Sequence, residues 1–193
     1  NNSINDEGMH FLCAALRLNL SLTKLSLRYT KLTETSLECL AKLMRCNPNV
    51  VHLDLYGSTL NSMASLPLIQ ALAYNHTITY LDFGCQQVTF QHGDRSLLYE
   101  TLGSIRSIKT LKLENNSMQD YSVTVLIKEL LSSRASITNL DLTRNFIGFK
   151  GVPAIATLIE ECPSLTKLNI SSSLLDQRAL ERLEAAVSRS RSL

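Results

Sequence analysis

The sequence has 193 residues, of which 45% are hydrophobic and 19% charged, so it holds enough apolar material for an ordinary globular domain and is not of disordered composition. Its 19 basic and 17 acidic residues leave a formal charge of +2, which offers no basic face for nucleic acid or anionic lipid. No run approaches the ~18 apolar residues of a membrane span. We therefore expect neither nucleic acid nor a membrane as a partner.

The cysteines bear on whether the chain has disulfides or a metal site, and on its redox compartment. They are odd in number, widely spread and never arranged as CxxC: Cys13, Cys39, Cys46, Cys85 and Cys162. This pattern argues against a disulfide framework and against a zinc site. We expect buried free thiols in a reducing compartment, which favours a cytoplasmic, intracellular protein. We expect no cofactor and no metal.

Six short strands are predicted along the chain, each from the same apolar pattern. The pattern has four framework positions, which are apolar in every copy, and its copies begin at Leu22, Val50, Ile78, Ile108, Ile137 and Leu165. The second framework position advances in steps of 28, 28, 30, 29 and 28 residues, from Leu25 to Leu168. A period of this length is typical of a solenoid.

A helix is predicted after each strand, because apolar residues recur there at helical spacing, as in Gly151, Ile155, Leu158 and Ile159. A small residue stands where each helix must approach its neighbour: Gly8, Ser36, Ala64, Ser122, Gly151 and Ala179. The third copy has His92 instead and is 30 residues long. We expect the segment from Thr89 to Ser96 to leave the regular path.

The repeat unit predicts an α/β fold. Alternate strand side chains share a face, so the two LxL residues point toward the helices. Stacked strands repeat every ~4.8 Å, whereas packed helices prefer ~8 to 10 Å, so the stack must bend. We predict a curved arc with a parallel β-sheet on the concave face and helices on the convex face, forming a single domain over residues 1–193.

The first 21 residues form a partial repeat without a strand. Asn2, Ile4 and Gly8 line up with the corresponding Asn145, Ile147 and Gly151 of a complete copy, and there is no initiating methionine. We expect a fragment of a longer protein that opens inside a repeat, so that Asn1 to Asn5 have lost a neighbouring strand.

The pattern LxxLxLxxNxL followed by a helical half resembles the leucine-rich repeat family, most closely its ribonuclease-inhibitor-like type. In that family the asparagine bonds backbone groups in the turn after the strand. Three residues here match it, namely Asn2, Asn116 and Asn145; the other copies have Thr30, Ser58, Gln86 and Ser173. Gln86 departs furthest from the pattern, beside the long third repeat, and the sequence does not determine the turn there.

Outward strand positions supply the candidate binding residues for a protein partner. These are Arg28, His52, Asp54, Tyr56, Tyr80, Asp82, Lys112 and Glu114. The tyrosines are candidate anchors, and Gly84 is expected to leave open space beside Tyr56. Asp82, Lys112 and Asp141 are interpreted as a cross-strand charge ladder. Asp54 and Asp82 should repel each other, a repulsion relieved by Lys112 and a protonated His52 or, alternatively, by a basic group of the partner.

Signs of catalysis are weak. The four histidines fall on different elements, no nucleophile and acid partner accompany them, and there is no phosphate-binding glycine loop. Asp54, Asp82 and His52 offer too few oxygen ligands for a divalent ion. The Asn-x-Ser/Thr sequons at Asn19, Asn75 and Asn169 are interpreted as accidental.

We therefore expect no enzyme and no catalytic residues, but a protein-protein interaction or scaffold module. The alternatives are a GTPase-activating module of the leucine-rich repeat type, and a recognition array attached to a catalytic domain outside this chain.

Overall fold

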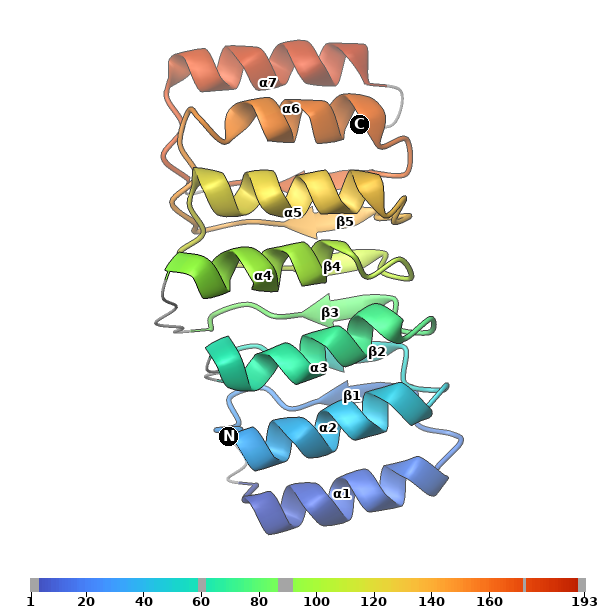
Figure 1. Ribbon diagram of the computed structural model, residues 1–193. Helices are drawn as coiled ribbons and strands as arrows, with labels where there is room; N and C mark the ends of the chain where they lie inside the picture. The colour runs from blue at the N-terminus through green and yellow to red at the C-terminus, as the bar shows by residue number, and fades with distance from the viewer. Residues whose placement is uncertain (1–3, 59–61, 87–91, 172, 191–193) are drawn as a thin grey trace.

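The computed structural model describes residues 4–58, 62–86, 92–171 and 173–190. In these ranges strands and helices alternate, and the strands form one parallel sheet in chain order (Figure 1). The strands are β1 Lys24–Ser26, β2 His52–Asp54, β3 Tyr80–Asp82, β4 Thr110–Lys112, β5 Asn139–Asp141 and β6 Lys167–Asn169. The helices are α1 Asp6–Leu18, α2 Glu34–Cys46, α3 Ser62–Tyr74, α4 His92–Gly103, α5 Asp120–Ser132, α6 Val152–Glu161 and α7 Gln177–Arg189.

The strands pair in the register that the repeat predicts. Leu25 lies opposite Leu53 and Leu53 lies opposite Leu81, and the equivalent leucines pair in the same way across the whole sheet. From β1 to β5 both residues of each LxL pair are buried. The core therefore lies between the sheet and the helices.

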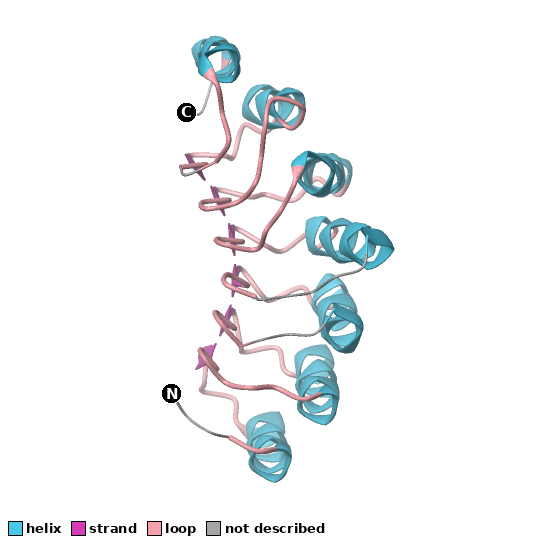
Figure 2. Cartoon of the chain, turned by 90° about the vertical axis from the view of Figure 1, so that its left-hand side faces the viewer, coloured by secondary structure: helices cyan, strands magenta, loops and turns pink. Residues whose placement is uncertain are grey.

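The molecule is an arc with the sheet on its concave side and the helices on its convex side (Figure 2). Each helix packs on the next along the chain, from α1 against α2 to α6 against α7. Because helices are thicker than the spacing between strands, the helical layer spreads and the sheet becomes the inner surface. The predicted fold class is confirmed.

Crowding in the first turn of the helices explains several of the small residues that recur in the repeats. Asn5, Thr33 and Asp176 are N-caps whose side chains accept a hydrogen bond from the backbone N–H three residues on. At Gly151 a Cβ would lie 2.9 Å from Asp120 Oδ1, so a larger residue would displace the preceding repeat. These positions are small because the helix start is crowded.

The turns after β2 to β5 are held by a buried ladder of side-chain hydrogen bonds. Asn145 Nδ2 donates to Leu113 O (2.9 Å) and Leu142 O (2.8 Å), and its Oδ1 accepts from the N–H groups of Asn116 and Met118. The next repeat toward the N-terminus does the same, because Asn116 Nδ2 donates to Phe83 O at 2.7 Å. The family resemblance assigned this role correctly.

Gln86 continues this ladder, although its position seemed irregular in the sequence. Its Nε2 donates to Leu55 O at 2.6 Å and Gly84 O at 3.1 Å, and its N–H donates to Asn116 Oδ1. Glutamine therefore supplies the same amide chemistry as asparagine. Ser58 makes one equivalent bond, from Oγ to Leu27 O.

A second ladder, missed in the sequence, holds the turns before the strands. Asn47 Nδ2 donates to Leu16 O and Asn75 Nδ2 donates to Met44 O, while each Oδ1 accepts from backbone N–H groups two and three residues on. Asn19 Oδ1 accepts in the same way. The sequons at Asn19 and Asn75 thus belong to turn motifs, and the 28-residue steps from Asn19 to Asn47 and from Asn47 to Asn75 were the available signal.

Some expectations lie outside the described part of the chain. Residues 89–91 of the segment predicted to leave the regular path lie there, whereas its remainder, from His92 to Ser96, forms the start of α4. Residues 1–3 also lie outside it, so the open edge proposed near the N-terminus stays a prediction. The five cysteines, all within the described ranges, form no disulfide; Cys13 and Cys162 are buried as expected, whereas Cys46 is exposed and Cys39 and Cys85 are half-buried, so the expectation of buried thiols was wrong for these three. Among the described helices, none has the length and apolar character to cross a bilayer.

Candidate binding face

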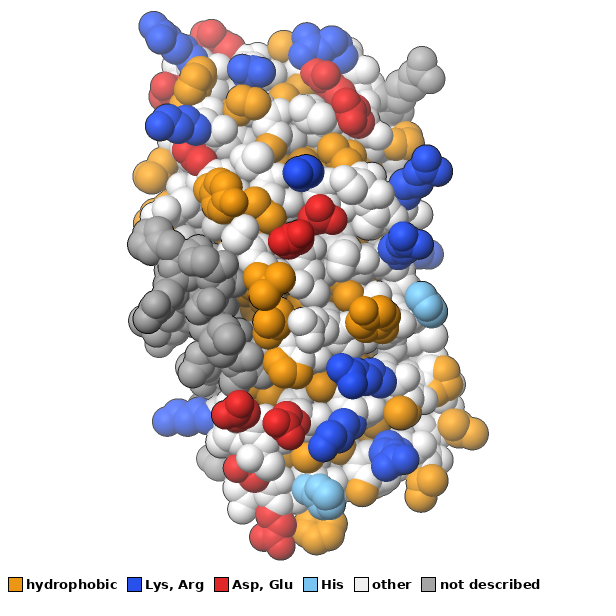
Figure 3. Space-filling model, in the orientation of Figure 1, with side chains coloured by type: hydrophobic (Ala, Val, Ile, Leu, Met, Phe, Trp, Pro, Cys, Tyr) orange, Lys and Arg blue, Asp and Glu red, His pale blue; other side chains and the backbone are white. Residues whose placement is uncertain are grey.

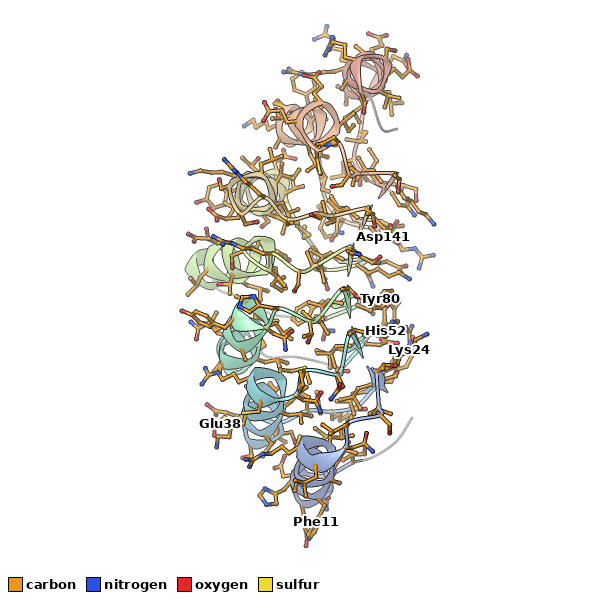
Figure 4. The ribbon with its side chains drawn as sticks, turned by 90° about the vertical axis from the view of Figure 1, so that its right-hand side faces the viewer. Phe11, Lys24, Glu38, His52, Tyr80 and Asp141 are labelled. Atoms are coloured by element: carbon orange, nitrogen blue, oxygen red, sulfur yellow. The ribbon has the colours of Figure 1, made fainter. Side chains whose placement is uncertain are left out.

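The eight candidate residues all lie on the outward positions of β1 to β4 or directly after these strands. Lys24, His52, Tyr80 and Asp141 line the sheet side of the molecule in Figure 4, whereas Glu38 lies on the helical side. The outward positions form three rows across the sheet, and the residues after the third row form a turn row. The rows are Lys24, His52, Tyr80, Thr110, Asn139, Lys167; Ser26, Asp54, Asp82, Lys112, Asp141, Asn169; Arg28, Tyr56, Gly84, Glu114, Thr143, Ser171; and the turn row Tyr29, Gly57, Cys85, Asn115, Arg144.

Arg28 joins the two neighbouring aspartates. Its Nη1 lies 3.1 Å from Asp54 Oδ2 and 3.4 Å from Asp82 Oδ2, although Asp82 is two strands away. The arginine side chain is 41% exposed, whereas those of Asp54 and Asp82 are 11% and 4% exposed. Arg28, which was not expected in this role, lies over both carboxylates. Burial raises the pKa of Asp82 and the charge of Lys112 opposes this rise, as expected, whereas burial lowers the pKa of His52 and disfavours its protonated form.

The aspartates also have a local structural role. Asp54 Oδ1 accepts from Tyr56 N–H, Asp82 Oδ1 from Gly84 N–H and Asp141 Oδ1 from Thr143 N–H. Each carboxylate therefore bonds the chain as it leaves its strand. Burial raises the pKa of Asp82, against the opposing effect of the Gly84 N–H bond.

Tyrosine rings cover the two glycines of this face. A Cβ on Gly84 would lie 2.8 Å from Tyr56 Cδ2, so the ring fills the space that was expected to be open. A Cβ on Gly57 would lie 2.7 Å from the ring of Tyr29 in the same way. The two rings meet edge to face with centroids 5.5 Å apart.

Arg28 also stacks on this aromatic pair. Its guanidinium carbon lies 4.3 Å from the centroid of Tyr56 and 5.9 Å from that of Tyr29. Burial, followed by the charge of Glu114, raises the pKa of Tyr56 to about 12, so its hydroxyl stays neutral. Tyr29 was missed in the sequence because it follows the strand pattern; its left-handed backbone (φ 52°) places it beside Tyr56.

A second cluster lies beside the first. His52 and Tyr80 stack face to face with centroids 3.7 Å apart and planes 5° apart, and Lys112 Nζ lies 5.6 Å from the Tyr80 centroid. A hydrogen bond with Tyr80 raises the pKa of Lys112, whereas burial and then the charge of Lys24 lower the pKa of His52. The proposed ladder Asp82, Lys112, Asp141 has the predicted register, but Lys112 contacts Tyr80.

Glu114 lies at the edge of the first cluster, where its charge acts on Tyr56. Its Oε1 lies 3.5 Å from Arg144 Nη1, a residue of the turn row that the sequence did not single out. The described residues include no group of three or more His, Cys, Asp or Glu side chains placed to hold a metal ion. The convex face, seen in Figure 3, carries both signs of charge interspersed over its helices.

The repeat geometry, the parallel sheet and the asparagine ladder together define a class: the chain is a leucine-rich repeat protein. No protein-family model matches it. It is 30% identical over 169 residues to "NACHT, LRR and PYD domains-containing protein 3" of Homo sapiens, covering 86% of this chain and 16% of the relative. It is 28% identical over 180 residues to "Protein phosphatase 1 regulatory subunit 37 homolog" of Caenorhabditis briggsae, covering 89% and 19%. The chain thus spans less than a fifth of either relative's length.

Solved structures show the same fold. The tropomodulin C-terminal domain of Caenorhabditis elegans superposes with a TM-score of 0.53 at 14% identity, covering 96% of this chain and 92% of that one. Leiomodin-1 actin-binding site 2 superposes with a TM-score of 0.52 at 17% identity, covering 98% and 90%.

Proposed function

We propose that this chain is a non-catalytic protein-interaction module that binds a protein partner through its concave sheet face, at β1 to β4. The observation that carries the proposal is the cluster of Arg28, Tyr29 and Tyr56, which is held by ion pairs and ring contacts and is partly open to solvent. Tyr29 is 53% exposed. Tyrosine and arginine are the residues that most often dominate interface energetics, and fixing them beforehand reduces the entropy lost on binding.

The relatives are consistent with this proposal. One is named as a regulatory subunit of a protein phosphatase, and one similar fold is named as an actin-binding site. Both names describe proteins that act on another protein. For this chain we assign the binding role to the curved sheet, and its partner stays to be identified.

The test compares exposed tyrosines on the two faces. Partners captured by the immobilised chain are measured again with purified components, using Tyr29→Ala with Tyr56→Ala and, as a control, Tyr74→Ala with Tyr121→Ala. The control tyrosines are 77% and 68% exposed and lie on α3 and α5. We expect the concave pair to weaken binding by about tenfold or more and the control pair to leave it unchanged. Equal effects of both pairs, or no effect of the concave pair, would refute the proposal.

A further inference from the structure

The accessible charge of the concave face has one sign, although the sequence has both. Among the four rows, all of which the structure describes, every exposed charged residue is a cation, namely Lys24, Arg28, Arg144 and Lys167. The acids are buried or half-buried, namely Asp54, Asp82, Glu114 and Asp141. A partner therefore meets a basic surface, even though the chain as a whole carries a formal charge of only +2.

The acidic side chains are not accessible because they make hydrogen bonds and ion pairs within the fold. Asp54, Asp82 and Asp141 each accept a hydrogen bond from the backbone at the end of their own strand. The remaining oxygens of the first two face Arg28, and Glu114 pairs with Arg144. A basic group on a partner would find no exposed carboxylate here, which argues against the earlier idea that such a group completes the patch.

Two lysines, the exposed Lys24 and the half-buried Lys112, flank a pair of stacked aromatic rings. Lys24 lies on β1 and Lys112 on β4, and the stacked rings of His52 and Tyr80 lie on the two strands between them. Lys112 lies three strand spacings from Lys24 and two residues further along its strand, which separates the two backbones by ~16 Å. An extended chain advances ~3.4 Å per residue, so two acidic residues four positions apart span ~14 Å, and the length of the lysine and glutamate side chains covers the difference. A side chain halfway between them would lie over the rings.

We propose that the partner binds this face with an acidic, extended protein segment, in which two carboxylates four residues apart contact Lys24 and Lys112 and a central apolar or aromatic side chain packs on His52 and Tyr80. This inference rests on the proposed function, because it names the partner chemistry of the same face. Nucleic acid fits less well: its phosphates are closely spaced, whereas these cations are separated by buried aspartates and stacked rings.

The direct test uses a designed peptide, Ser-Gly-Glu-Thr-Phe-Thr-Glu-Ser-Gly, added to the isotope-labelled chain up to about 2 mM, a range that detects millimolar affinity by NMR. We expect amide and ring shifts at His52, Tyr80 and Lys112, and little change with a peptide that has Gln at both Glu positions. Lys24→Gln with Lys112→Gln should weaken binding by about tenfold. The matched control on α2, Lys42→Gln with Arg45→Gln, should leave the affinity unchanged.

Two further measurements separate the alternatives. Peptide affinity should fall as salt rises from about 50 to about 300 mM, because the contacts are between exposed charges. Equal binding of the Gln peptide, no shifts at these residues, or tighter binding of an oligothymidylate would overturn the acidic-segment inference. A captured partner that depends on Tyr29 and Tyr56 but not on Lys24 and Lys112 would also overturn it, while leaving the proposed function intact.

Discussion

Arg28 and Asp82 are 54 residues apart in the sequence and two strands apart in the sheet, yet Nη1 of the arginine lies 3.4 Å from Oδ2 of the aspartate. The arginine crosses Asp54 on the way and bonds both of its oxygens. One cation therefore serves two carboxylates that the strand register places side by side. Its removal should affect three repeats together.

Arg28→Met should lower the free energy of unfolding by about 1 to 3 kcal/mol at pH 7, the size of a screened repulsion between carboxylates on adjacent strands. Burial already raises the pKa of Asp82, and losing Arg28 should raise it further. An acid with a raised pKa binds protons more readily in the folded state, so the deficit should shrink as pH falls through that pKa. Urea unfolding of the original chain and of Arg28→Met at pH 7 and pH 4.5 measures this difference in the free energy of unfolding.

The matched variants for Arg28 are Lys24→Met, which removes an exposed cation from the same strand, and Asp82→Asn in the Arg28→Met background. We expect the first to be nearly neutral and the second to restore most of the lost stability. If Lys24→Met and Arg28→Met were equally destabilising, the bridging role would be wrong.

Gly84→Ala should destabilise the chain by about 1 to 3 kcal/mol, because the new methyl group would lie 2.8 Å from the Tyr56 ring. The effect should be much smaller in a Tyr56→Ala background, where the ring is absent. A double-mutant cycle by chemical denaturation measures the coupling. Additive effects of the two substitutions would show that the contact does not limit this position.

Asn145→Ala should be among the most destabilising single substitutions, at about 2 to 4 kcal/mol. The amide bonds two carbonyls and two N–H groups of buried turns, which would lose their partners. Asn139→Ala, at a half-buried outward position of β5, is the control and should cost much less. Thermal and urea unfolding compare the two, and similar losses would contradict the ladder's importance.

His52 should titrate below its ordinary pKa, and Lys24→Gln should raise that pKa. Burial and the charges of Lys24 and Lys112 oppose protonation, and Asp54 favours it. Because a lowered pKa means fewer protons bound in the folded state, His52 should reduce stability as pH falls below about 6.5. NMR titration of the ring protons tests this. Lys167→Gln, in the same row but on β6, should not shift the curve.

The sequence predicted the strands, their register and the outward rows, because a constant period determines which residues become neighbours in a stacked sheet. It did not predict which neighbours interact. Arg28 reaches across two strands because its side chain is long, and Lys112 turns to Tyr80 rather than to the adjacent acids. The repeat spacing predicts which strand positions are adjacent, but it does not predict which neighbour a long side chain will contact.

Other parts of the site depended on backbone conformation. Tyr29 reaches the site through a left-handed φ, and the space at Gly84 is filled from the previous repeat by Tyr56. Asn19 and Asn75 were interpreted as chance glycosylation sequons, and Asn47, which is followed by Pro48, was not singled out. The 28-residue spacing of these three residues was a stronger signal than the sequon itself.

The two hydrogen-bond ladders change their chemistry along the arc but run along both of its edges. On the side where strands lead into helices, amides bond successive repeats at Gln86, Asn116 and Asn145, and the hydroxyl of Ser58 makes the corresponding bond nearer the N-terminus. On the side where helices lead into strands, amides do so at Asn47 and Asn75, and the hydroxyls of Ser107, Ser133 and Ser164 continue the bonding toward the C-terminus. A force that bends the arc should therefore strain side-chain hydrogen bonds at both edges at once.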